Sequence, residues 1–238
     1  MRRSLATIIL AVALPACGSD RENADTSTPA LAPRTDATLD VDSQRLPPRD
    51  ESLPERPAAR QDTIVVEGTP EVMDFALVRS PPGFLIPFST YVPASMTVTM
   101  DTAGPTDVAT FTSGEAREMM DEAFMTVGIY PAGTTLLQAE DSIREFVVSR
   151  GPGIDESRAV EPPSWGEWAV ELSYPRSLDR WYAGSAVIGQ YGPRYFHVLQ
   201  LYPAEYGDGI RPRFQAVLEH WRWDDTGRML ESGGTSTR

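Results

Sequence analysis

The chain has two histidines, His197 and His220, and they limit the acid–base chemistry that it can perform. A Ser-His-acid triad would have to use one of them. The dipeptide Gly184-Ser185 lacks the Gly-x-Ser-x-Gly elbow that exposes a nucleophilic serine. His197 alternates with apolar residues in a strand-like segment, and His220 ends a helix-like segment, where a cation suits the helix dipole. Both histidines are therefore predicted to be structural, and the chain is predicted not to be an enzyme.

Paired carboxylates are a second candidate for catalysis, because most glycosidases use two of them. Glu167 and Glu171 flank Trp168, which offers an aromatic platform beside them. Four positions apart on an extended strand, the two acids would share a face at a separation of about 13 Å. The carboxylates of a retaining glycosidase are only about 5–5.5 Å apart. We therefore interpret Glu167 and Glu171 as solvated side chains at a strand edge.

The composition also argues against metal and cofactor sites. One Cys and two His are too few for the usual structural zinc site. The segment Gly151-Pro152-Gly153 lacks the Lys and the Ser or Thr of a phosphate-binding loop. No catalytic residue, metal ligand or cofactor is predicted.

Aromatic residues are the richest chemical feature of the second half of the chain. Tryptophan is enriched at binding hot spots, although it also fills cores. Trp165 lies in the loop-like segment Pro162-Pro163-Ser164-Trp165-Gly166, which makes it the best candidate for an exposed ring. Trp168 follows it, and Met119-Met120 lie in a segment that fits either a short helix or a loop. We assign Trp165, Trp168, Met119 and Met120 as a candidate recognition surface, with core packing as the alternative.

Charge and cysteine content exclude several classes of protein. The chain has 238 residues, a net charge of −13, 21 arginines and no lysine. A disulfide scaffold needs paired cysteines, and Cys17 stands alone. Strong nucleic-acid binding needs a basic surface, so no nucleic-acid partner is expected.

The N-terminus has the pattern of an export signal. Two arginines precede an apolar run from Leu5 to Leu14, which is too short to span a bilayer. The segment Leu14-Pro15-Ala16-Cys17 resembles the bacterial lipobox, in which the cysteine is lipidated and becomes the first mature residue. This resemblance implies a signal peptide over residues 1–16, lipidation at Cys17 and a membrane contact through the lipid. The protein is therefore expected in the bacterial cell envelope, and at the outer membrane or facing the periplasm in a two-membrane cell.

The residues after Cys17 have the composition of a tether. Residues 18–62 contain no aromatic residue, and they hold six prolines, ten acids and six arginines. Such a segment cannot bury enough apolar surface to offset the entropy of ordering. We expect a disordered tether over residues 17–62, a folded domain over residues 63–225, and a disordered tail over residues 226–238.

Strand signals dominate the expected domain, and helix signals are fewer. All 21 aromatic residues lie between Phe75 and Trp223. Alternation and β-branched runs predict strands at residues 63–66, 96–100, 108–112, 124–130, 168–174, 181–190 and 195–202. The turn at Tyr191-Gly192-Pro193-Arg194 predicts a hairpin. A capping box at Thr135 and Gln138 starts one helix, and a second helix is expected after Asp208.

This pattern resembles the PsbP-like fold, a family that groups the extrinsic PsbP protein of photosystem II with bacterial relatives. The segment Phe88-Ser89-Thr90-Tyr91-Val92-Pro93 is similar to the family's opening strand, and residues 195–203 and 213–223 are similar to its closing strand and helix. The resemblance covers roughly residues 85–223. It implies an α+β fold in which helices flank an antiparallel β-sheet as an αβα sandwich, and it carries over no catalytic residue.

Two functions stay open from the sequence. The first is a non-catalytic, membrane-anchored lipoprotein whose domain binds another envelope protein or a membrane complex. The alternative is a module that binds a small ligand or a glycan through the tryptophan-rich second half.

Overall fold

The computed structural model describes residues 50–113, 123–150, 158–177 and 180–230. Its strands are β1 (Ala59–Val66), β2 (Thr69–Arg79), β3 (Phe88–Pro93), β4 (Met96–Asp101), β5 (Asp107–Ser113), β6 (Phe124–Ile129), β7 (Arg158–Ala159), β8 (Gly166–Ser177), β9 (Arg180–Tyr191), β10 (Arg194–Pro203) and β11 (Arg222–Trp223). Its helices are α1 (Leu136–Arg150), the short 3-10 helix η2 (Ala204–Tyr206) and α2 (Gly207–Glu219).

The larger of two antiparallel sheets has seven strands in the order β4-β5-β6-β10-β9-β8-β7. The predicted hairpin is confirmed, because β9 and β10 pair along their lengths and Gly192 takes a positive φ of 56° in the turn between them. Glycine adopts that backbone conformation without the steric cost that a Cβ brings. The predicted strands of this sheet are therefore found where alternation placed them.

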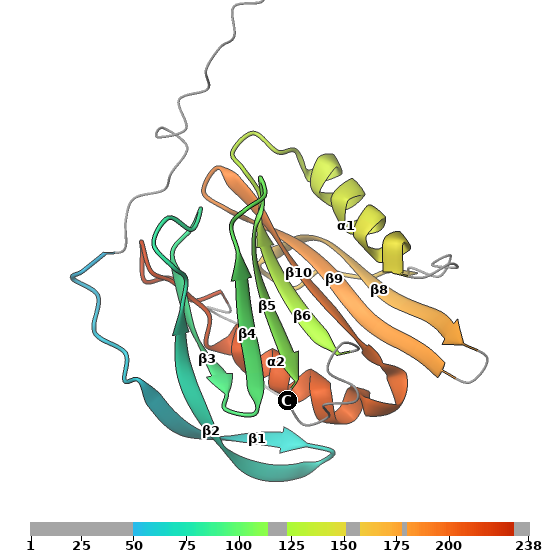
Figure 1. Cartoon of the computed structure of the whole chain (residues 1–238), viewed down its shortest axis with the longest axis horizontal. Helices are drawn as coiled ribbons and strands as arrows, with labels where there is room; N and C mark the ends of the chain where they lie inside the picture. The colour runs from blue at the N-terminus through green and yellow to red at the C-terminus, as the bar shows by residue number, and fades with distance from the viewer. Residues whose placement is uncertain (1–49, 114–122, 151–157, 178–179, 231–238) are drawn as a thin grey trace, which may run out of the picture. The chain divides into compact units, whose positions relative to one another are not determined.

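The two helices cover opposite faces of the seven-stranded sheet (Figure 1). On one face, Ala139, Ile143 and Val147 of α1 pack against a cluster that includes Leu199 and Leu201 of β10. On the other face, the apolar stripe of α2 packs against a cluster that includes Phe196 and Val198. Successive side chains of β10 point to opposite faces of the sheet, so this one strand contributes side chains to both hydrophobic clusters.

The smaller sheet has four strands in the order β1-β2-β3-β11. It shares the α2 side of the molecule, because α2 packs against β3 and β1 as well as against β10. Trp221 and Trp223, the two tryptophans that follow α2, are 0% and 2% exposed in this core. Core packing is thus the role of these two rings.

Both predicted helices are present with their predicted apolar stripes, and α1 has its predicted capping box. The Thr135 hydroxyl accepts from the Gln138 amide nitrogen at 3.3 Å, and the Gln138 side chain accepts from the Thr135 amide nitrogen at 2.9 Å. These reciprocal bonds satisfy the free donors at the start of α1. α2 begins at Gly207, earlier than predicted, so Pro212 is its sixth residue and lies inside the helix, where it cannot donate the usual backbone hydrogen bond.

The fold class is confirmed at the level of an α+β protein built on antiparallel sheet, but the chain is richer in strands than the expected sandwich flanked by helices. The four-stranded sheet occupies part of the face that a second helical layer would cover. Many positions of β1 and β2 are exposed and polar, so the composition of these segments did not predict this sheet.

The start and end of the folded part also differ from the expected boundaries. β1 begins at Ala59, inside the segment assigned to the tether, and the chain is already hydrogen-bonded at Asp50. At the other end, Leu230 is 8% exposed and its amide nitrogen donates to the Trp221 carbonyl oxygen at 2.9 Å. Residues 50–62 and 226–230 therefore belong to the fold. Residues 17–49 and 231–238 of the expected tether and tail lie outside the described residues.

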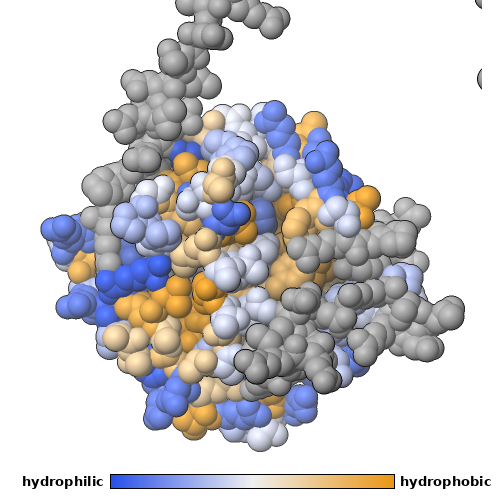
Figure 2. Space-filling view, viewed as in Figure 1, coloured by the Kyte–Doolittle hydropathy of each residue, from blue (hydrophilic) through white to orange (hydrophobic). Residues whose placement is uncertain are grey.

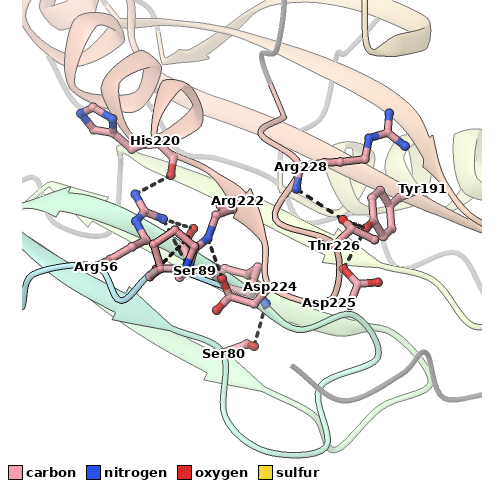
Figure 3. A network of polar contacts seen from close by, with 12 residues as sticks. Arg56, Ser80, Ser89, Tyr191, His220, Arg222, Asp224, Asp225, Thr226 and Arg228 are labelled. Atoms are coloured by element: carbon pink, nitrogen blue, oxygen red, sulfur yellow. Dashed lines mark hydrogen bonds and ion pairs between the residues drawn. The ribbon is translucent and has the colours of Figure 1, made fainter. Parts of the chain in front are cut away.

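Residues 50–58, which we call the N-terminal strap, are attached by a polar network (Figure 3). The Arg56 guanidinium donates to the Ser89 carbonyl oxygen and to the His220 carbonyl oxygen, each at 2.9 Å. The Ser89 hydroxyl in turn donates to the buried Asp224 carboxylate at 2.6 Å, and the Arg222 side chain donates to the same carboxylate at 3.0 Å. The network links the strap to β3 and β11.

Within the part of the chain that the structure describes, no helix is both long and apolar enough to cross a membrane. Figure 2 shows hydrophilic and hydrophobic residues mixed over the face that Figure 1 presents.

Candidate binding groove

A groove lies between α2 and strands β8, β9 and β10, with a volume of about 710 Å³. The small residues on its floor explain why the groove exists. The consecutive β9 residues Ala183, Gly184 and Ser185 line it, and their small side chains leave the space under α2 unfilled. Gly184 cannot be larger, because a Cβ there would overlap the backbone carbonyl of Gln200 on β10.

The pairing of the strands gives the groove two different ends. At one end, Val187 of β9 pairs with Val198 of β10, and both line the groove. Four pairs further along, Ala183 pairs with Tyr202 beside the N-terminus of α2. Four strand residues separate the two ends, which corresponds to about 13 Å.

Trp165 forms the wall of the apolar end. Its ring stacks on Phe196, with centroids 5.7 Å apart and planes inclined by 22°. The ring is partly buried, and its indole N–H is buried with no hydrogen-bond partner among the described residues. Pro163 lines the groove beside it, on the loop that precedes β8. The predicted recognition residue Trp165 thus lines a groove whose volume is large enough for a ligand.

Charged residues of both signs surround the polar end. Burial raises the pKa of the Tyr202 phenol, the Arg211 guanidinium opposes this effect, and the carboxylates of Glu171 and Asp208 add to it. All three charged residues line the groove. Glu171 also pairs with the exposed Arg158 at 3.2 Å. This end therefore offers donors and acceptors without a large excess of either charge.

Trp168 lies on the opposite face of the sheet from the groove. It lines a separate apolar slot of about 170 Å³ between α1 and β8, with Val147 and Leu172 among its walls. The Arg144 guanidinium lies 6.0 Å from the centre of the Trp168 ring. Trp165 and Trp168 therefore do not form one surface, since they line cavities on opposite faces of the sheet, as expected of residues three positions apart near a strand. Met119, Met120 and Cys17 lie outside the described residues.

The groups weighed for catalysis do not converge. His197 is held on the α1 face, where its Nδ1 is 2.9 Å from the Tyr130 hydroxyl, and burial lowers its pKa to about 4. His220 follows α2, where its Nε2 lies 3.3 Å from the Asp62 carboxylate. The prediction that both histidines are structural fits these contacts.

The expected arrangement of Glu167 and Glu171 was wrong in one respect. Glu167 contacts Tyr195, which packs against the α1-face cluster, whereas Glu171 lines the groove. The two acids therefore lie on opposite faces rather than on one, because the bulge between Gly166 and Trp168 shifts the alternation of β8. Among the residues that the structure describes, no group of three or more His, Cys, Asp or Glu could hold a metal ion.

Sequence reasoning missed most of the groove. Tyr202, Asp208 and Arg211 were read only as parts of a strand and a helix, although they line its polar end. Trp181, which is 47% exposed, stands two positions before Ala183 and so on the same side of β9. The signal that could have revealed the hollow is the run of small residues on one side of β9.

No family model matches the chain, and no curated protein matches it. A solved structure from Bacteroides thetaiotaomicron VPI-5482 is similar to it, with 15% sequence identity and a TM-score of 0.38. The match covers 61% of this chain and 47% of that one, so the chain spans about half the length of that structure.

Proposed function

We propose that this chain is a lipid-anchored protein of the bacterial cell envelope whose domain binds another envelope component in the groove without catalysing a reaction. The observation that carries the proposal is the groove itself. Its volume of about 710 Å³ lies in the range of about 300–1,000 Å³ that is usual for ligand sites. It combines apolar walls with a few polar groups, as such sites do.

We further propose that the domain is PsbP-like. The support is an antiparallel sheet with one helix on each face, together with the similarity of residues 85–223 to the family pattern. The known members of that family act mainly by binding, which agrees with a non-catalytic role, but fold alone does not assign function.

The membrane anchor is proposed from the sequence around Cys17. Acyl chains contribute about 0.8 kcal/mol per buried CH₂, so several chains hold a protein stably at a membrane. The substitution Cys17→Ser should move the protein from the membrane fraction to the soluble fraction. A variant that stays in the membrane fraction would contradict the anchor.

Two classes of occupant are candidates. A protein or membrane complex would be expected to use Trp165, Trp168 and the two methionines together, and the separation of Trp165 from Trp168 speaks against such a shared surface. A small ligand or a glycan needs only the groove. The geometry therefore favours the small ligand or glycan, and a protein segment seated in the groove is the second candidate.

The test compares two variants of the full-length, lipidated protein after chemical cross-linking in its native membranes. Ser185→Trp fills the groove, and Val148→Trp adds the same ring to an exposed position of α1. We expect a captured envelope component that Ser185→Trp loses and Val148→Trp keeps, provided that both variants unfold at the wild-type temperature. Capture that Ser185→Trp leaves unchanged would contradict the proposal.

A further inference from the structure

We infer that the occupant of the groove is a short, neutral oligosaccharide. This inference rests on the proposed function, because it names the ligand of the same groove. Sugar rings offer an apolar face that packs on aromatic rings and a rim of hydroxyls that both donate and accept hydrogen bonds. The groove presents matching features in four respects.

Aromatic rings lie at one end of the groove and beyond the other. Trp165 lines the groove at the Val187 end. The exposed Trp181 lies outside the lining residues, two positions before Ala183 on β9, where strand alternation places it on the same side of the sheet. Val187 and Trp181 are six positions apart on β9, which corresponds to about 20 Å. Between them β9 contributes only the small residues Ala183, Gly184 and Ser185 to the floor, so a chain of flat rings can lie along this strand. This length suits an oligosaccharide better than a single compact ligand.

The charges of the groove favour a neutral ligand. Glu171 and Asp208 disfavour an anion, and Arg211, which lines the same groove, disfavours a cation. The chain as a whole carries a net charge of −13, which also disfavours acidic ligands. Hydroxyl groups can use both kinds of charge, because they donate to carboxylates and accept from a guanidinium.

Polar side chains line the groove and can bond to a ligand. The Tyr202 phenol and the Gln200 amide both line it, and the Gln200 nitrogen makes a long contact of 3.8 Å to the sulfur of Met125. The indole N–H of Trp165, another lining residue, is buried and unpaired among the described residues. Buried polar groups are normally satisfied, so this N–H would gain a partner if its ring turned toward a bound ligand.

The pairing of the strands disfavours a peptide ligand. Extended peptides commonly bind by adding a strand to a free sheet edge. The two floor strands β9 and β10 each have a partner on both sides, so their backbone groups are already used. Recognition in this groove must therefore rely on side chains, as it does in sugar binding.

The test is calorimetric titration of the full-length protein in detergent with cellotetraose, maltotetraose and chitotetraose, one at a time. We expect saturable binding of at least one, with a dissociation constant between about 10 μM and 1 mM. Arg211→Ala should weaken it about tenfold by removing charge-assisted hydrogen bonds. Trp181→Ala should weaken it about two- to tenfold. Arg144→Ala, an exposed arginine on the opposite face, is the matched control and should leave binding unchanged.

The absence of saturable binding for all three oligosaccharides up to about 10 mM would overturn this inference. Oligosaccharide binding that neither Arg211→Ala nor Ser185→Trp weakens would also overturn it. If no oligosaccharide binds but the membrane capture still depends on Ser185, the ligand class is wrong and the proposed function stands. If the capture is also insensitive to Ser185→Trp, the proposed function fails as well.

Discussion

The imidazole ring of His197 on β10 lies directly over Gly128, its cross-strand partner on β6. A Cβ at position 128 would overlap the ring. The ring is fixed from both sides, because its Nδ1 meets the Tyr130 hydroxyl at 2.9 Å and its Nε2 lies 3.4 Å from the Thr126 hydroxyl. Glycine is therefore required at position 128 by the close approach of a neighbouring side chain.

Gly128→Ala should lower the free energy of unfolding by more than about 2 kcal/mol, because the added methyl group must displace a packed ring. The same substitution should cost much less in a His197→Ala background, since that background removes the ring. Urea unfolding of the four proteins of this double-mutant cycle measures the coupling. Equal costs of Gly128→Ala in both backgrounds would show that the contact is not the cause.

His197 should also make stability depend on pH. Burial lowers its pKa in the folded chain to about 4 from its usual value of about 6.5, so the unfolded chain binds the proton more tightly. The stability contributed by neutral His197 is therefore complete above about pH 6.5 and is lost as the pH falls toward about 4, by about 3 kcal/mol at most. His197→Gln should show a smaller loss over this range, and a loss equal to that of the wild type would contradict the assignment.

Asp224 should be among the most sensitive positions on the α2 side of the molecule. Its carboxylate is 2% exposed and accepts from Ser89 and Arg222. Asp224→Ala leaves the buried Arg222 guanidinium without this partner, and the expected cost is about 3–5 kcal/mol. Asp101→Ala is the matched control, because that exposed carboxylate accepts only a local amide at 2.8 Å, and its cost should stay below about 1 kcal/mol. Similar midpoints for the two variants in urea would refute this prediction.

Arg56 should hold the N-terminal strap to the domain. Its guanidinium donates to two backbone carbonyls and lies 4.4 Å from the centre of the Tyr91 ring. Arg56→Ala should speed hydrogen exchange of the strap amides at least tenfold, while Arg60→Ala, which loses an exposed ion pair with Asp62, should change it little. Equal exchange in the two variants would mean that the strap is held by other contacts.

The sequence predicted correctly the strands, turns and helix ends that depend on residues close together in the chain. The alternation of β10, the glycine turn before it and the capping box of α1 all appear in the structure as predicted, because each depends on neighbouring residues. The start of the fold could not be found in this way. Residues 50–62 have the composition of a tether. The N-terminal strap is attached by contacts that are distant in sequence, such as those of Arg56 with Ser89 and His220, and residues 59–62 pair with β2.

The groove was hidden for a similar reason. Trp165 was predicted as a recognition residue from its loop, but most of the other groove residues come from β9, β10 and α2, which are distant from it in sequence. Glu167 and Glu171 lie on opposite faces because a single bulge in β8 shifts the alternation between them. Periodicity predicts the face of a residue only where the ladder is regular.

The central claim, that the groove binds a component of the cell envelope, is tested most directly by site-specific photo-cross-linking in native membranes. A photoreactive phenylalanine analogue is placed at Gln215 in the groove and, as the control, at Val148 on α1. We predict a discrete cross-linked product from position 215 that is absent from position 148 and lost in the Ser185→Trp background. The same products from both positions, or none from position 215, would contradict the claim.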